Sequence, residues 1–277
     1  HLDWHLSQEE YLWAKSNLVR NQQEHQHLIY YSDSENCQTM IQSSLAKRLP
    51  FGESVSQTRT PSAQRIIFNK DQSFKYIHDE EGVKETFLLG KTNIMGSHQL
   101  QNISAATLAG ATVGLNVKKM WSSLKSFVGP KMRLQVVGES QSIRFINDSY
   151  ATRPDASIAA VQSITEPLAL ILGGSDKNAN FDELVQELLS HKYLVGLFLI
   201  GQTAPRLRKI ILDNHIDVPT KEFQEFSCAL ESAKVLLEKQ QLRGTLLLSP
   251  ACASFGMFKN YVDRGQKFND WVEKTIG

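Results

Sequence analysis

The amino-acid sequence predicts an α/β protein whose second half is built on a mostly parallel sheet. The first observation is that continuous apolar runs, Leu168–Leu172 and Val195–Ile200, alternate with amphipathic helical segments. Strands that are apolar on both faces and joined by helices are typical of a parallel sheet covered on both sides. The second observation is the stretch Thr245–Phe255, where an apolar run stops at Ser249-Pro250 and small residues follow. Open α/β sheets place ligands at such strand ends.

The first half of the chain is predicted to contain shorter elements. Ser7 and Glu10 form a capping-box pattern that opens a helix through about Asn21. Apolar and small residues at helical spacing, bounded by Gly114, predict a helix over Asn102–Val113. The other elements expected here are strands at Leu28–Tyr31, Arg65–Phe68 and Ser73–Ile77 and helices at Cys37–Leu49 and Val117–Phe127.

The pair Gly129-Pro130 predicts a domain boundary, because the pattern changes to a regular alternation of strands and helices after it. The two domains expected are residues 1–130 and 131–277. In the second, Gln135–Glu139 and Ile143–Asn147 predict a hairpin. The helices expected here are Asp155–Ile164, Phe181–Leu189, Ala204–Asn214, Ser227–Glu238 and Met257–Thr275, the last with an apolar stripe of Phe258, Tyr261, Val262 and Trp271.

Composition excludes several classes of protein. The 277 residues are 41% hydrophobic and 21% charged with a formal net charge of +1, which gives no bulk electrostatic reason to expect a nucleic acid or a membrane surface as partner. The apolar runs are far shorter than the roughly 20 residues of a membrane helix. Cys37, Cys228 and Cys252 lie far apart in the sequence, so neither a disulfide framework nor a structural zinc is expected. A reducing compartment, the cytoplasm, is favoured.

Polar segments follow three of the predicted strands, and the fold is expected to bring them together. They are Asn147–Thr152, Gly173–Lys177 and Ser249–Phe255. Any one of them alone is an ordinary surface connection, but the carboxyl ends of neighbouring strands form one ligand site. Lys177 is suited to hold a carboxylate or phosphate as a point charge. Cys252 is expected to be a buried, inert thiol, since no His-Asn partner pattern accompanies it.

Other side chains of these segments have complementary chemistry. Thr152 and Ser254 offer hydroxyl donors, and Asp148 is an acceptor that could orient a ribose, a metal-bound water or an arginine. Near the N-terminus, His1 and Asp3 are possible metal ligands, although an isolated histidine there is more often solvated.

Six segments, in order along the chain, resemble the Mur ligase family, specifically its D-glutamate-adding members. Such an ordered set is far more specific than a single glycine-rich loop. The segments are His1-Leu2-Asp3-Trp4-His5 with Glu10-Tyr11 and Ala14-Lys15, Gly96–Asn102, Met132-Arg133, Asn147–Thr152, Leu172–Lys177 and Leu248–Gly265.

The resemblance implies an ATP-dependent, Mg²⁺-using cytoplasmic ligase of peptidoglycan precursor synthesis, monomeric, with UDP-N-acetylmuramoyl-L-alanine and D-glutamate as substrates. The carboxylate of the first would be phosphorylated and the acyl phosphate attacked by the amine of the second. The first domain would be the C-terminal part of the family's ATP-binding middle domain, and the second its Rossmann-like C-terminal domain.

The resemblance also implies roles for individual residues. His1 would hold the Mg²⁺ ion and Lys15, once carbamylated, would supply an oxygen ligand. The nucleotide site would include Asn102, Arg133 and Asp148, and the D-glutamate pocket Thr152, Lys177, Ser254 and Phe255.

The chain departs from the family pattern in several places. No Gly-x-x-x-x-Gly-Lys-Ser/Thr phosphate loop occurs in it, so it is expected to be a piece of a longer ligase and inactive by itself. Tyr150 stands where the family commonly has a lysine, and Gln99 and Arg153 each replace an asparagine; Arg153 could supply the charge missing at Tyr150. The alternatives are another ligase of the superfamily, including one that adds glutamate to folate, and a non-catalytic binding module that kept the fold.

Overall fold

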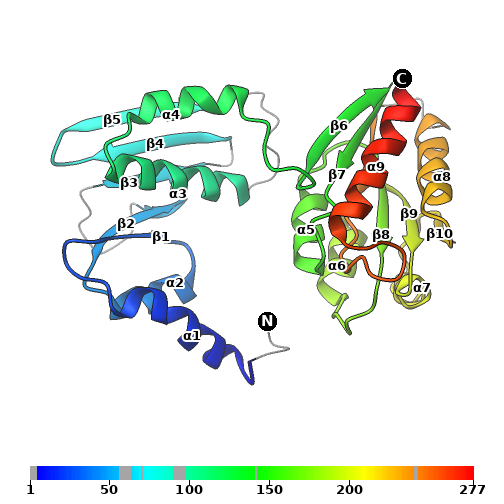
Figure 1. The fold of residues 1–277 in the computed structure, drawn as a ribbon, viewed down its shortest axis with the longest axis horizontal. Helices are drawn as coiled ribbons and strands as arrows, with labels where there is room; N and C mark the ends of the chain where they lie inside the picture. The colour runs from blue at the N-terminus through cyan, green and yellow to red at the C-terminus, as the bar shows by residue number, and fades with distance from the viewer. Residues whose placement is uncertain (1–4, 56–63, 70, 90–97, 141, 240–242) are drawn as a thin grey trace. The chain divides into compact units, whose positions relative to one another are not determined.

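The computed structural model describes residues 5–55, 64–69, 71–89, 98–140, 142–239 and 243–277. These residues form two compact units, the first extending to Phe127 and the second beginning at Val128 (Figure 1). Each unit has its own sheet and its own helices, which confirms the predicted α/β class. Two parts of the family resemblance lie outside the described residues: residues 1–4 of the N-terminal segment, and residues 96 and 97 of the segment Gly96–Asn102.

The sheet of the first unit is mixed. Its strands follow one another in chain order, with the first three parallel and the last two antiparallel. They are β1 (His27–Tyr31), β2 (Lys47–Gly52), β3 (Gln64–Phe68), β4 (Ser73–His78) and β5 (Val83–Leu88).

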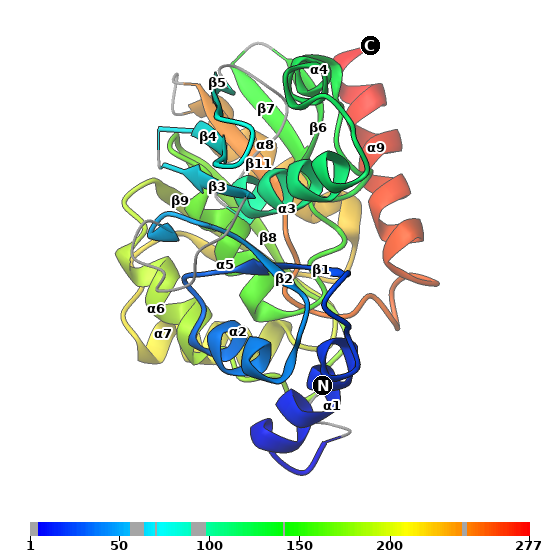
Figure 2. The same ribbon diagram turned by 90° about the vertical axis from the view of Figure 1, so that its left-hand side faces the viewer.

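The helices of the first unit are α1 (Gln8–Arg20), α2 (Glu35–Met40), α3 (His98–Thr112) and α4 (Val117–Ser123), with 3₁₀ turns following α2 and α4. The third helix packs on the parallel strands, and the fourth packs on the third. The first helix lies beside the second in both views (Figure 1 and Figure 2).

The start of α1 follows the predicted cap with one change. Ser7 Oγ accepts a hydrogen bond from the Glu10 N–H at 3.2 Å, as expected. The Glu10 carboxylate, however, accepts from the Leu6 N–H at 2.7 Å and not from Ser7 itself. The first contact satisfies a backbone donor that the helix leaves free at its first turn, and the second satisfies the N–H of Leu6, just before the N-cap.

The helix predicted over Cys37–Leu49 is wrong beyond Met40, because Lys47–Gly52 forms β2. This strand contains Pro50, although proline is usually confined to edge strands and bulges. The backbone of Phe51 bonds to β1, as its carbonyl accepts from the Ser32 N–H at 2.9 Å, so the neighbouring Pro50 faces β3. Pairing between β2 and β3 begins only at Phe51. Pro50 therefore lacks an N–H at a position where no hydrogen bond between the strands is needed.

The second unit contains a six-stranded, mostly parallel sheet. The strand order is β10-β9-β8-β11-β7-β6, and the β6–β7 hairpin is its one antiparallel pair. The bounds are β6 (Gln135–Ser140), β7 (Ile143–Asn147), β8 (Leu168–Gly173), β9 (Leu194–Ile200), β10 (Thr220–Phe223) and β11 (Gly244–Leu248). All but β10 were predicted to within a residue or two.

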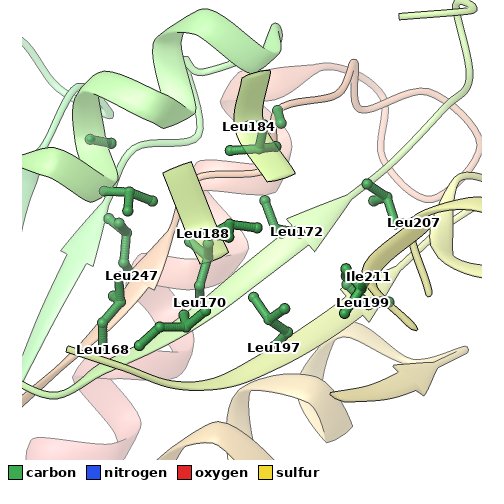
Figure 3. Close-up of a cluster of buried hydrophobic side chains, with 14 of the residues drawn as sticks. Leu168, Leu170, Leu172, Leu184, Leu188, Leu197, Leu199, Leu207, Ile211 and Leu247 are labelled. Carbon is green, nitrogen blue, oxygen red and sulfur yellow. The ribbon is translucent and has the colours of Figure 1, made fainter. Parts of the chain in front are cut away.

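Alternate residues of the central strands build two cores, one on each face of this sheet. Leu168, Leu170 and Leu172 pack with α5 (Pro154–Gln162), α6 (Asp182–Ser190) and α7 (Ala204–Asp213), as Figure 3 shows for the leucines of α6 and α7. Ala169 and Ile171 face α8 (Phe226–Lys239) and α9 (Tyr261–Ile276) on the other side. The continuous apolar run is therefore explained by burial on both faces.

The last helix begins later than predicted. Asn260 Oδ1 accepts hydrogen bonds from the N–H groups of Val262 and Asp263, which makes Asn260 the N-cap of α9. The predicted apolar stripe is wrong for Tyr261 and Val262, which are exposed. Trp271 packs on the core from α9 as predicted, and Phe258 is in the core but precedes the helix. The buried residues of α9 are Arg264, Gly265, Phe268 and Val272. Among the described helices, none is long and apolar enough to cross a membrane.

Candidate functional site

The loops after β7, β8 and β11 meet at the carboxyl edge of the sheet, as the sequence predicted. The Asp148 N–H donates to the carbonyl of Leu248 at 2.8 Å. Across the same edge, the Gly173 N–H donates to the Pro250 carbonyl and the Ser175 N–H to the Ala253 carbonyl, each at 2.8 Å. Backbone bonds thus tie together three segments that lie far apart in the sequence.

The position of β11 explains why a site forms there. This strand lies between β7 and β8, and the helices that follow those two strands pack on one face of the sheet while α9 packs on the other. Where neighbouring connections leave toward opposite faces, a crevice opens at the strand ends. The loop after β11 lies at that point.

Two glycines allow the β8 loop to approach its neighbours closely. A Cβ at Gly173 would lie 2.2 Å from the carbonyl oxygen of Ile200, and one at Gly174 would lie 2.1 Å from that of Ala253. Both contacts are with backbone, which cannot give way as a side chain can. Thr203 completes the arrangement, because its Oγ1 accepts from the Gly174 N–H at 3.0 Å. Glycine is required here by the packing of one loop on another.

Asp148 lies at the base of this edge and is 5% exposed. Its Oδ1 accepts from the Leu134 N–H at 3.0 Å, and its Oδ2 accepts from the Ser249 hydroxyl at 2.7 Å. Burial raises the pKa of the carboxyl to about 6, although those hydrogen bonds and the charges of Arg133 and Arg264 act in the opposite direction. Asp148 therefore fixes the segment that carries Arg133 against the loop after β11.

Lys177 and Phe255, expected in one pocket, are brought together from different loops. The ammonium of Lys177 lies 5.8 Å from the centre of the Phe255 ring, and both side chains are exposed. The shape of the Lys177 loop depends on its neighbour Asp176. One terminal nitrogen of Arg206 donates to both carboxylate oxygens of Asp176, at 2.9 and 3.0 Å, and the Asn178 N–H donates to Oδ1 at 2.8 Å. Sequence reasoning missed Arg206, since its partner is distant in the chain.

Hydroxyl groups lie in the same loops. Thr152 is half-buried, and Ser254 is 3% exposed, with its carbonyl accepting from the Phe258 N–H. Ser175 was not singled out from the sequence. Its Oγ is buried and finds no hydrogen-bond partner among the described residues.

Arg133, near the N-terminal start of the second unit, packs beside two tyrosines. Its guanidinium is 4.7 Å from the centre of the Tyr150 ring, and Tyr150 meets the Tyr261 ring edge-on at 5.2 Å. Together with Met132 and Val262, these side chains line an open pocket of about 400 Å³. Arg153 forms an ion pair with Asp155 at 3.0 Å, so its charge is already engaged.

Arg264 is the residue of the site that sequence reasoning missed most completely. It is fully buried on α9 and donates three hydrogen bonds to the loops after β7 and β11. Amphipathic spacing gave no signal, because an arginine on a surface helix is usually solvated. Cys252 accepts one of these bonds through its carbonyl, and burial raises the pKa of its thiol, which agrees with the expected inert role.

The remaining predicted residues lie in the first unit. Lys15 is exposed on α1, with its ammonium 5.5 Å from the centre of the Tyr11 ring. Asn102 is exposed on α3 and donates to the side-chain oxygen of Gln99 at 3.1 Å. His1 lies outside the described residues. Within the described part of the chain, no three His, Cys, Asp or Glu side chains gather as metal ligands would.

Two family models match the chain in succession. Residues 1–110 match the Mur ligase middle domain, and residues 132–252 match the Mur ligase glutamate ligase domain.

Relatives that are named UDP-N-acetylmuramoylalanine–D-glutamate ligase match along the whole chain. The protein of Caldanaerobacter subterraneus subsp. tengcongensis is 32% identical over 275 residues, and that of Bacillus mycoides is 32% identical over 277. These matches cover 98% and 100% of this chain but 57% of each relative. The chain therefore spans little more than half the length of the curated relatives it matches.

Solved structures share the fold at low sequence identity. A pseudomurein peptide ligase type C from Methanothermus fervidus aligns with a TM-score of 0.63 at 12% identity, over 97% of this chain and 60% of that one. The folylpolyglutamate synthase of Thermotoga maritima aligns with a TM-score of 0.58 at 16% identity, over 99% and 60%. With both domain models matched in order and relatives similar along its full length, the chain belongs to the Mur ligase family.

Proposed function

We propose that this chain is the larger part of an ATP-dependent ligase that joins D-glutamate to UDP-N-acetylmuramoyl-L-alanine in peptidoglycan precursor synthesis. The observation that carries the proposal is the meeting of three loops at the carboxyl edge of the second sheet, with Lys177 and Phe255 at its exposed side. The names of the relatives support the choice of amino acid. We assign residues 1–130 to the ATP-binding middle domain and 131–277 to the acceptor domain of a cytoplasmic monomer.

In the proposed reaction, an oxygen of the muramoyl-alanine carboxylate attacks the γ-phosphorus of ATP, and ADP leaves. The amine nitrogen of D-glutamate then attacks the carbonyl carbon of the acyl phosphate. The new C–N bond forms, the C–O bond to phosphate breaks, and the nitrogen loses a proton. Both steps bring negatively charged groups of the substrates together. Positioning and charge neutralisation therefore supply most of the catalysis.

The acceptor pocket is proposed to hold the two carboxylates of D-glutamate. The exposed ammonium of Lys177 would pair with one of them, and the hydroxyls of Thr152 and Ser254 would donate to them. Phe255 shields that pairing from water on one side, since its ring already lies against the Lys177 ammonium.

The nucleotide is proposed to contact Asn102 and Arg133. Asp148 would contribute to this site mainly by holding the backbone next to Arg133, because its carboxylate oxygens already bond to Leu134 and Ser249. Mg²⁺ would be held by His1 and by Lys15 after carbamylation. Carbamylation would be needed because it converts the Lys15 ammonium, which cannot bind a metal ion, into a group with oxygen ligands.

Amino-acid binding to the 277-residue chain tests the acceptor pocket. We expect D-glutamate to shift the amide signals of the three loops in an NMR titration. Lys177→Met should weaken binding roughly tenfold or more, because it removes a charged partner. Lys192→Met is the matched control: Lys192 is also exposed and also lies over a ring, that of Tyr193 at 4.9 Å, and its loss should leave the affinity unchanged.

The same titration separates the alternatives. Stronger binding of another amino acid would place the chain with a different ligase of the superfamily, and absence of any binding would favour a non-catalytic module. Because the chain has no phosphate-loop motif, we expect no ADP release when it is given ATP and both substrates. Robust turnover would show that the missing loop is dispensable.

A further inference from the structure

We propose that Arg264 is a positioning residue for the amino-acid substrate: it holds the loops after β7 and β11 in the arrangement that the acceptor pocket requires. The identity of the substrate rests on the proposed function, whereas the positioning rests on the contacts of Arg264 alone.

The burial of Arg264 is the first argument. Its side chain has no exposed surface, although a guanidinium is costly to remove from water. Burial lowers its pKa to about 10, so the group remains protonated at neutral pH. Among the described residues, none of the ion pairs involves Arg264. The Asp148 carboxylate favours the charge of Arg264 without contacting it, but every hydrogen bond of the guanidinium goes to an uncharged group, so direct pairing does not explain its burial.

The hydrogen bonds of Arg264 give the reason for its burial. Its Nε donates to the Ser149 hydroxyl at 3.0 Å and one terminal nitrogen donates to the Ser149 carbonyl at 2.9 Å. The other terminal nitrogen donates to the Cys252 carbonyl at 3.0 Å. One rigid group therefore joins two loops that are separated by more than a hundred residues. The Ser149 hydroxyl in turn donates to the Tyr261 carbonyl at 2.8 Å, which adds the start of α9 to the assembly.

These two loops carry the proposed substrate contacts. Ser149 precedes Thr152 in one loop, and Cys252 precedes Ser254 in the other. The third loop is attached to the second, because the Ser175 N–H donates to the Ala253 carbonyl. A shift of the Cys252 carbonyl would therefore move all three loops. The positive charge beneath them also favours an anionic substrate, since it acts in a water-poor environment.

A lysine at position 264 cannot donate the same set of hydrogen bonds. A guanidinium presents donors in a fixed plane and reaches both carbonyls at once, whereas an ammonium is a compact point charge. Arg264→Lys keeps the charge and most of the volume, and Arg264→Met keeps only the volume. Phe268→Leu is the matched control, because Phe268 is equally buried on α9 but belongs to the core cluster on the sheet face and contacts no loop carbonyl through hydrogen bonds.

The experiment compares these variants in the 277-residue chain by two readouts. The first is the affinity for D-glutamate, and the second is hydrogen exchange at the amides of Gly173 and Ser175, relative to that of Leu170 in β8. Both Arg264 variants should weaken binding at least tenfold and raise exchange at Gly173 and Ser175 selectively. Phe268→Leu should lower the unfolding temperature while leaving affinity within twofold.

Arg264 variants that behave like Phe268→Leu in both readouts would overturn the positioning role, since they would show a contribution to stability only. If the unmodified chain binds no D-glutamate, the proposed function fails, and hydrogen exchange still decides the role of Arg264. Selective loss of protection at Gly173 and Ser175 would support it, and unchanged protection would refute it.

Discussion

The carboxyl group of Asp148 lies in an environment that disfavours its charge. Its pKa in the folded protein is about 6, against an ordinary value of 3.8. Between these values the folded chain binds more protons than the unfolded chain, so the free energy of unfolding falls as the pH rises through this window. The contribution of Asp148 is fully present below about pH 4 and is lost above pH 6, a change of about 3 kcal/mol.

Replacing Asp148 by asparagine tests this linkage, because asparagine does not titrate. The difference in free energy of unfolding, Asp148→Asn minus the unmodified chain, should rise by about 2–3 kcal/mol between pH 4 and pH 7. Urea unfolding at steps of half a pH unit measures the difference. Asp213→Asn, at an exposed position on α7, should show no such trend. A constant difference between Asp148→Asn and the unmodified chain would contradict the assigned environment.

Individual site residues were predictable where they follow a strand. Lys177 and the segment Ser249–Phe255 were singled out because strand ends of a parallel sheet meet, a rule that needs no knowledge of tertiary contacts. Phe255 itself was named only by the family resemblance. Arg206 and Arg264 were not found, since each acts through partners that only the folded chain brings near. The exact pairing of Lys177 with Phe255 was likewise beyond the sequence, because it depends on how two loops pack.

At the level of elements, the loop after β8 depends on the absence of a side chain at Gly174. An alanine there would place its Cβ 2.1 Å from the Ala253 carbonyl oxygen. The loops would have to separate, so Gly174→Ala should lower the free energy of unfolding by about 1–3 kcal/mol. It should also raise hydrogen exchange at Ser175, which donates to that carbonyl.

Gly256→Ala is the control for this change. Gly256 has a φ of 93°, but the space that a Cβ would occupy there is open, so its replacement brings backbone strain of about 1–2 kcal/mol without a clash. Exchange at Ser175 should then stay as in the unmodified chain. Unchanged exchange at Ser175 in Gly174→Ala would contradict the prediction, because it would show that the alanine is accommodated without separating the loops.

Elements were predictable where burial is uniform. The strands Leu168–Gly173 and Leu194–Ile200 are buried along nearly their whole length, so an apolar run identified them. The missed strand β10, Thr220–Phe223, has no buried residue and lies at the sheet edge, where it is held by backbone pairing with β9 and by the packing of Phe223 on Phe198. β5 (Val83–Leu88) likewise has no buried residue, and polar residues occupy three of its six positions, which concealed it in the same way.

At the scale of the whole molecule, the second unit has a complete core of its own. Both clusters that sandwich its sheet are drawn from residues between Leu134 and Val272. α9 closes one face, because it packs along β6 and β7, as Figure 1 shows. A unit whose buried surface is internal should not need the rest of the chain to fold.

Residues 128–277 should therefore fold as an independent domain. We expect a cooperative thermal transition by circular dichroism and amide signals that overlay those of the same residues in the 277-residue chain. A shorter piece, residues 128–259, should fail to fold, since it loses Arg264, Phe268 and Val272 from the buried face of α9. If residues 128–277 bind D-glutamate as the 277-residue chain does, the acceptor pocket belongs to this unit alone. A non-cooperative transition for residues 128–277 would contradict the prediction, because it would mean that the two cores need residues from the first unit.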